Sequence, residues 1–272
     1  MFAKSHSSLV LRPTSIVAGI LATICIMLGG TADSFGSVIS GASSSYELSV
    51  NLNVAFSTLT VPAIPVAQGT APSPFSDGTF VAGYAASHPV IGSANTGLMT
   101  VNATSNIDGL AGSRSAAADA TVHDLLLNIV PGLPTTLHAT ATTVASTANV
   151  SGDFGSLAAL GTTTLENLSL SVLGVTIPVT SNPAPNTEVF NTGWILIVLN
   201  EEIPGGNGTS SRSLAVNAIH INFTNAPIAT GLLNGDIFVS HSQSSLTATP
   251  EPATAGLLLV AALMGRMRRR RR

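Results

Sequence analysis

Histidines, carboxylates and serines are the residues of this chain whose types suit catalysis or metal binding. Its central part contains five histidines: His88, His123, His138, His220 and His241. It also contains twelve acids: Asp33, Glu47, Asp77, Asp108, Asp119, Asp124, Asp153, Glu166, Glu188, Glu201, Glu202 and Asp236. A Ser-His-Asp triad is recognised by its geometry and not by composition. Because the sequence has no Gly-x-Ser-x-Gly nucleophile elbow, we predict no catalytic residue.

Metal ligation has little support in the sequence. No His-x-x-x-His pair occurs, and the only cysteine, Cys25, lies near the N-terminus, so zinc is not indicated. Glu201 and Glu202 beside Asn200, and Asp153 in a glycine-rich stretch, offer oxygen ligands for calcium. However, the acidic pattern of a calcium-binding loop is absent, and neighbouring residues of a strand point to opposite faces. We therefore predict no cofactor and retain calcium as the alternative.

The aromatic residues are expected in the core. Tyr46 and Phe56 fall on the apolar face of an alternating segment, and Trp194 opens an apolar run. A surface that binds carbohydrate usually exposes its aromatic rings, so these positions argue against one. The sequence does not indicate a ligand.

Short strands must position these residues. In residues 45–57, six apolar side chains alternate with polar or small ones, the pattern of a half-buried strand. Residues 61–76 contain four prolines and are predicted to form a loop. Further strands are expected at residues 98–103, 137–150, 194–199, 214–223 and 235–241, with a hairpin at 165–179 that turns at Gly174. Residues 121–129 suit a buried strand, with a helix as the alternative. The chain is thus predicted to be all-β, an antiparallel sandwich-like or barrel-like single domain flanked by two helical hydrophobic targeting segments.

The N-terminus has the pattern of a secretory signal peptide. Lys4 and Arg12 precede an apolar run of 13 residues, 16–28, and small residues follow up to Ala32. The run is shorter than the about 20 residues that usually span a bilayer. Cleavage after Ala32 is therefore favoured over a membrane anchor, and it would remove Cys25. We assign residues 1–32 to the signal peptide and 33–249 to the β domain.

Residues 250–272 form a second targeting segment. Pro250, Glu251 and Pro252 precede the apolar residues 253–265, and a basic cluster ends the chain: Arg266, Arg268, Arg269, Arg270, Arg271 and Arg272. This order resembles the PEP-CTERM protein-sorting signal of Gram-negative bacteria. The resemblance implies cleavage by an exosortase, a processing enzyme of the inner membrane. The arginines are expected to stay cytoplasmic, and the short apolar segment suits a transient anchor. A permanent anchor is the alternative.

The segment between the two targeting signals also resembles a known group. Residues 183–187, 194–202, 214–221 and 235–239, together with 165–168 and the strand at Tyr46, are similar in order to the choice-of-anchor P family. The resemblance covers about residues 46–247. It implies an extracellular β domain and supplies no catalytic residue.

The charge distribution bears on partners. The formal net charge of the whole chain is −3, but it is unevenly distributed. Residues 33–249 contain two arginines and twelve acids, which gives this segment a formal charge of −10. Such a body repels nucleic acid. We predict a non-enzymatic exported protein that passes the Sec translocon, is held briefly at the inner membrane and reaches the cell surface or medium. The resemblance implies a matrix, biofilm or surface-coat role beside exopolysaccharide systems; the alternative is a secreted hydrolase acting on surface polysaccharide.

Overall fold

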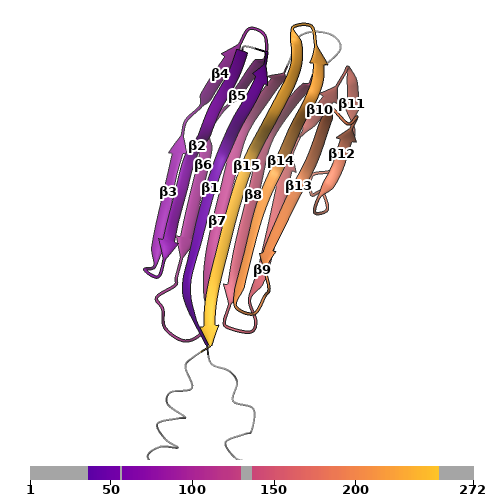
Figure 1. Ribbon diagram of the computed structural model, residues 1–272. Helices are drawn as coiled ribbons and strands as arrows, with labels where there is room; N and C mark the ends of the chain where they lie inside the picture. The colour runs from indigo at the N-terminus through magenta and orange to yellow at the C-terminus, as the bar shows by residue number, and fades with distance from the viewer. Residues whose placement is uncertain (1–35, 56, 130–136, 251–272) are drawn as a thin grey trace, which may run out of the picture. The chain divides into compact units, whose positions relative to one another are not determined.

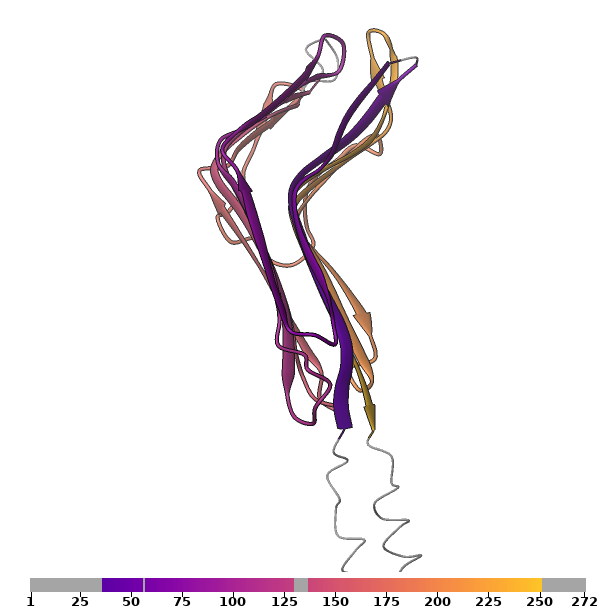
Figure 2. The same cartoon turned by 90° about the vertical axis from the view of Figure 1, so that its left-hand side faces the viewer.

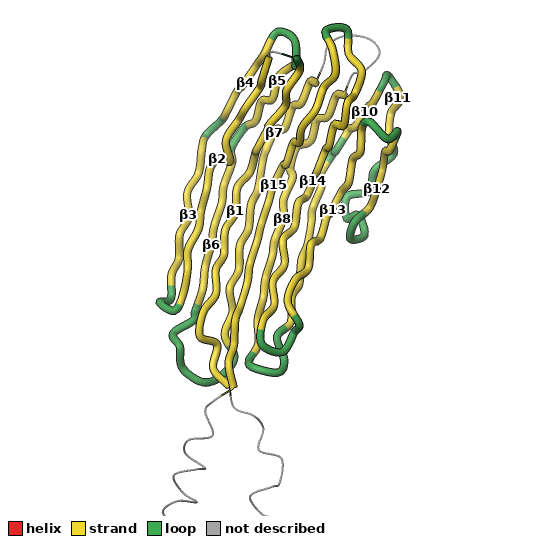
Figure 3. The backbone as a smooth tube through the Cα atoms, viewed as in Figure 1, coloured by secondary structure: helices red, strands yellow, loops and turns green. Residues whose placement is uncertain are grey.

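The structure is a computed structural model that describes residues 36–55, 57–129 and 137–250. These residues form fifteen β-strands and no helix, so none of them belongs to a helix that could cross a membrane (Figures 1 and 3). The prediction of an antiparallel all-β chain is confirmed. The two predicted helical targeting segments lie outside the described residues, except for Pro250.

The first sheet has six strands in the order β12-β13-β14-β15-β1-β2. Its strands are β1 (Gly36–Val54), β2 (Ser57–Ala71), β12 (Thr187–Asn191), β13 (Ile195–Gly206), β14 (Ser211–Ile228) and β15 (Gly231–Pro250). β1 and β15, the first and last strands of the described residues, pair from Gly36 opposite Pro250 to Val54 opposite Leu233. The two ends of the described chain therefore leave the sheet side by side.

The second sheet has nine strands built around the long pair β7–β8. Its strands are β3 (Phe75–Val81), β4 (Tyr84–His88), β5 (Gly92–Thr96), β6 (Met99–Ser105), β7 (Arg114–Ile129), β8 (Leu137–Gly152), β9 (Ala158–Glu166), β10 (Ser169–Val172) and β11 (Val175–Ile177). One half of β7 pairs with β6 and the other half with β5, while β8 pairs in the same way with β9 and β10. Figure 2 shows the two sheets face to face.

The space between the sheets is filled differently in its two halves. One half is a hydrophobic core of large side chains from both sheets, among them Phe223 and Leu127. In the other half, serines of the six-stranded sheet donate hydrogen bonds to backbone carbonyls of the facing sheet. Ser45 Oγ lies 2.9 Å from Asn102 O, and Ser244 Oγ lies 2.8 Å from the carbonyl oxygen of Ala148. These bonds satisfy hydroxyl groups that would otherwise be costly to bury.

Both sheets bend at the level where the two halves meet (Figure 2). In the four inner strands of the six-stranded sheet, two consecutive residues are buried here instead of alternating. The pairs are Glu47–Leu48, Val239–Ser240, Ala218–Ile219 and Leu199–Asn200; in β14, Asn217 is buried as well, although its side chain bonds Glu201 on the outer face. In β7 and β8 the extra residues face outward, at His123–Asp124 and Thr142–Thr143. Neighbouring strands carry the extra residue at the same level, so their pairing keeps its register there. The inward direction of the six-stranded sheet is the outward direction of the nine-stranded sheet, so the two sheets bend together. We call Glu47, Ala218, Asn200 and Ser240 the bulge row.

The bulge row corrects one prediction in strand β1. The alternating pattern places Tyr46 in the core and Glu47 in solvent, but Glu47 is fully buried and Tyr46 lies on the outer face. Residues from Leu48 onward do follow the predicted alternation. Because Glu47 and Leu48 are both buried, the residues of β1 before Glu47 alternate between the two faces in the opposite sense to the prediction. Sequence periodicity alone does not reveal this change. Phe56 lies outside the described residues.

Other strand predictions have mixed outcomes. The predicted loop at 61–76 is wrong except at residues 72–74, because β2 runs through Pro62 and Pro65 to Ala71 and β3 begins at Phe75. β2 is an edge strand that pairs only with β1, and the pairing shifts register between Leu48 and Val50, where Pro62 lies, so the strand accommodates its prolines. The hairpin that turns at Gly174 is confirmed by β10 and β11. Residues 121–129 belong to a strand, and β15 extends beyond the predicted 235–241 at both ends.

Candidate functional site

The five histidines do not gather in one place. His88 Nδ1 accepts a hydrogen bond from the Val90 backbone N–H (3.3 Å), and His123 Nδ1 lies 3.5 Å from Thr143 Oγ1 on the outer face of the nine-stranded sheet. His138 lies on β8 beside Ser171 of β10. Within the described residues, no hydrogen bond joins a histidine ring to a serine hydroxyl. His220 and His241, in contrast, share one polar network on the six-stranded sheet.

That network lies on the outer face, where the sheet bends. Tyr46, His241, Asn217 and Glu201 are register partners in the adjacent strands β1, β15, β14 and β13. On the same outer face, His220 and Phe238 are register partners in the next row along the strands. Asn222 and Asp236 are partners in the row after that. This outer face is the concave side of the bend, so the rows approach one another there and side chains from different rows are in contact.

His220 lies between two carboxylates. Its Nδ1 is 3.0 Å from Glu201 Oε2, and its Nε2 is 3.1 Å from Asp236 Oδ1. Both carboxylates receive a second hydrogen bond, from Asn217 Nδ2 to Glu201 (2.6 Å) and from Asn222 Nδ2 to Asp236 (2.8 Å). An ionised carboxylate only accepts, so both contacts to His220 are hydrogen bonds when both ring nitrogens carry hydrogen. The network holds its acids and its histidine in fixed positions.

Two aromatic stacks complete the network. The rings of Tyr46 and His241 lie 4.4 Å apart and nearly parallel, and those of His220 and Phe238 lie 4.3 Å apart. His241 Nδ1 is 2.6 Å from Asn217 Oδ1. Burial lowers the pKa of His241 to about 4 and raises the pKa of Tyr46 to about 12. This ring pair is therefore uncharged at neutral pH.

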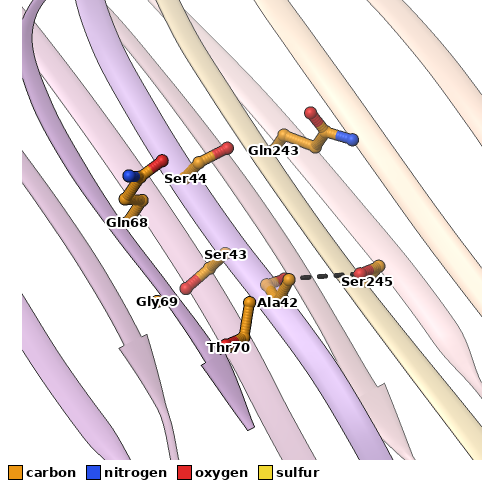
Figure 4. Close-up of a pocket in the computed structure, with 8 residues that line it drawn as sticks. All are labelled: Ala42, Ser43, Ser44, Gln68, Gly69, Thr70, Gln243 and Ser245. Atoms are coloured by element: carbon orange, nitrogen blue, oxygen red, sulfur yellow. Dashed lines mark hydrogen bonds between the residues drawn. The ribbon is translucent and has the colours of Figure 1, made fainter.

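A groove lies on the same face, one row along the strands from the Tyr46–His241 stack. Figure 4 shows the residues that line it. Its volume is about 520 Å³, and it is lined by Ala42, Ser43, Ser44, Gln68, Gly69, Thr70, Gln243 and Ser245. None of these residues is charged, and most carry a hydroxyl or an amide. Sequence reasoning missed this groove, although one signal was present: Gln68 and Gln243 are the only glutamines of the chain.

Glu47 lies on the opposite side of β1, between the sheets. One carboxyl oxygen accepts the Thr121 backbone N–H, and Oε2 has no hydrogen-bond partner among the described residues. Burial raises the pKa of Glu47 to about 9; the Thr121 N–H opposes this shift, and the charge of Asp119 adds to it. The Glu47 carboxyl is therefore protonated at neutral pH.

The predicted calcium ligands are separated. Glu201 and Glu202 face opposite sides of β13, as predicted: Glu201 joins the outer network, while Glu202 lies beside Gly161 of the other sheet. Asn200 is buried, bonded to Thr163 and to the Pro183 carbonyl. Asp153 caps its own turn by accepting the Phe154 N–H. In the described ranges, no group of three or more His, Cys, Asp or Glu side chains is arranged so that it could hold a metal ion.

The predicted processing residues lie at or beyond the ends of the described chain. Pro250 is the last residue of β15. The remaining residues of the predicted sorting and cleavage sites lie outside the described ranges: Ala32, Glu251, Pro252, Arg266, Arg268, Arg269, Arg270, Arg271 and Arg272. No protein-family model matches the chain. No curated protein matches it either.

Proposed function

We propose that this protein is an exported, non-enzymatic component of the cell surface or extracellular matrix, sorted through its C-terminal segment. The observation that carries the proposal is the order of parts at the C-terminus: Pro250-Glu251-Pro252, a short apolar segment, and the arginine cluster. The signal-peptide pattern that ends at Ala32 and the acidic body between the two segments support it.

The strand order adds further support. Gly36 and Pro250 are register partners, so both targeting segments are attached at neighbouring points of one sheet. In this proposal, the Sec translocon exports the chain, the C-terminal segment anchors it briefly in the inner membrane, and an exosortase-type enzyme releases it. The released segment, residues 33–249, then carries a formal charge of −10 from two arginines and twelve acids.

The outer network supports a binding role over hydrolysis. Glu201 and Asp236 both hold His220 and each also accepts a hydrogen bond from an asparagine, so the network is built from contacts among its own members. The network also lies in the middle of a sheet face rather than on loops. These contacts favour the non-enzymatic proposal over a polysaccharide hydrolase.

Mass spectrometry of the mature protein from its native host tests the sorting proposal. We expect a C-terminus near Pro250-Glu251-Pro252 without the arginine cluster, and an unprocessed chain for the variant Glu251→Ala. Thr247→Ala, an exposed change three residues before Pro250 on β15, serves as the matched control and should be processed normally. Mature protein that still carries Arg266 to Arg272 would contradict the proposal.

A further inference from the structure

The groove on the six-stranded sheet is built from two register rows of three strands. One row across β2, β1 and β15 consists of Gln68, Ser44 and Gln243. The next row along the strands on the same face consists of Thr70, Ala42 and Ser245. Figure 4 shows Gln68, Ser44 and Gln243 together along one side of the groove. Both glutamines of the chain thus lie in one row, on either side of Ser44, although they are far apart in the sequence.

Several polar groups of the groove have no hydrogen-bond partner among the described residues. Among the hydrogen bonds of the described residues, none uses the side chains of Ser44, Gln68 or Thr70. Ser245 Oγ makes a long contact of 3.5 Å with the Ala42 carbonyl, and Gln243 is hydrogen-bonded to His241. The groove therefore offers hydroxyl and amide groups, both donors and acceptors, to a ligand.

An aromatic pair lies next to one end of the groove. On the outer face, Tyr46 is the neighbour of Ser44 along β1, and His241 is the neighbour of Gln243 along β15. Both side chains are partly exposed. Because burial keeps both rings uncharged at neutral pH, this end presents ring surface and polar edges without a net charge.

We infer that the groove binds a neutral glycan. The hydroxyl-rich edges of sugar rings match the row Gln68, Ser44 and Gln243, and their C–H faces match the Tyr46 ring. An anionic ligand is disfavoured because no basic residue lines the groove, and a cation because no carboxylate does. The inference goes beyond sorting: it concerns residues far from Glu251, and it holds whether or not the C-terminus is cleaved.

Calorimetric titration of the full chain, purified in mild detergent, tests this inference. The probes are maltohexaose, cellohexaose and an alginate hexamer, which is polyanionic. We expect at least one neutral hexaose to bind and the alginate hexamer to bind much more weakly. The double variant Gln68→Ala/Gln243→Ala should weaken binding about tenfold, because it removes both amide groups that would hydrogen-bond the sugar. Ser44→Trp, which fills the groove, should abolish binding.

Asn53→Ala provides the matched control, because Asn53 is an exposed amide on the same strand as Ser44 but away from the groove. It should leave the affinity unchanged. The inference is overturned if neither neutral hexaose binds, if alginate binds as tightly as the neutral sugars, or if the double variant binds like the unmodified chain. Failure of the sorting proposal would appear separately, as an unprocessed C-terminus in the host.

Discussion

At the scale of single residues, Glu47 links pH to stability. Its carboxyl group is fully buried, and Oε2 has no partner among the described residues. The pKa is raised from 4.5 to about 9, so the folded protein keeps a proton that the unfolded chain loses near pH 4.5. Between these values the unfolded state binds fewer protons. The stability that Glu47 contributes is therefore complete below about pH 4.5 and is lost as the pH rises toward 9.

The variant Glu47→Gln should remove this dependence. Glutamine keeps an oxygen for the Thr121 N–H but does not titrate. We expect the free energy of unfolding of the unmodified protein, relative to this variant, to fall between pH 5 and 8.5 by up to about 1.4 kcal/mol per pH unit. Urea unfolding at several pH values measures the difference. Glu166→Gln, at an exposed position, is the control and should show no such trend; a pH-independent difference for Glu47→Gln would refute the assignment.

At the scale of elements, the bulge row shapes the six-stranded sheet. Asn200 and Ser240 have positive φ values of 51° and 56°, and they lie on alternate strands, β13 and β15. Their side chains bond across the interior: Ser240 Oγ to the Ala120 carbonyl, and Asn200 to Thr163 and Pro183. The row therefore bends the sheet and satisfies polar groups at the same level. Asparagine suits the left-handed conformation better than most residues.

Substitution of Asn200 tests the bulge row. Asn200→Val should destabilise the protein by about 2–4 kcal/mol, because it loses two buried hydrogen bonds and places a β-branched residue in the left-handed region. Asn225→Val provides the comparison, since Asn225 has a φ of 53° but is exposed. It should cost about 1–2 kcal/mol from backbone strain alone. Equal losses in urea unfolding would show that the buried bonds of Asn200 contribute nothing.

At the scale of the whole molecule, the packing of the two sheets decides which phenylalanines matter. Phe223 is 1% exposed in the large core, whereas Phe80 on edge strand β3 is 67% exposed. Phe223→Ala should cost about 3–5 kcal/mol, because it leaves a cavity among side chains that cannot fully collapse. Phe80→Ala should change the free energy of unfolding by less than about 0.5 kcal/mol. Chemical denaturation of both variants measures this contrast, and similar losses would contradict the described core.

Period-two patterns in the sequence predicted much of the fold. Ile219, Ile221 and Phe223 lie on the inner face of β14, and His220 and Asn222 lie on its outer face, as the alternation indicates. Alternation was reliable here because each side chain of a half-buried strand meets either the core or solvent. The pattern did not predict β2, since proline excludes a central strand but not an edge, and strand order is not visible in local sequence.

The sequence by itself determined the β class, the concentration of acids in the body and of bases at the ends, and the order of the C-terminal segment. Only the tertiary structure decided the faces of Tyr46 and Glu47, because one extra buried residue reverses the alternation and its place depends on the facing sheet. The structure alone also joined Gln68 with Gln243, and Glu201 with His220 and Asp236. Antiparallel pairing brings together residues that are distant in sequence, and register, which local composition does not encode, determines which of them meet.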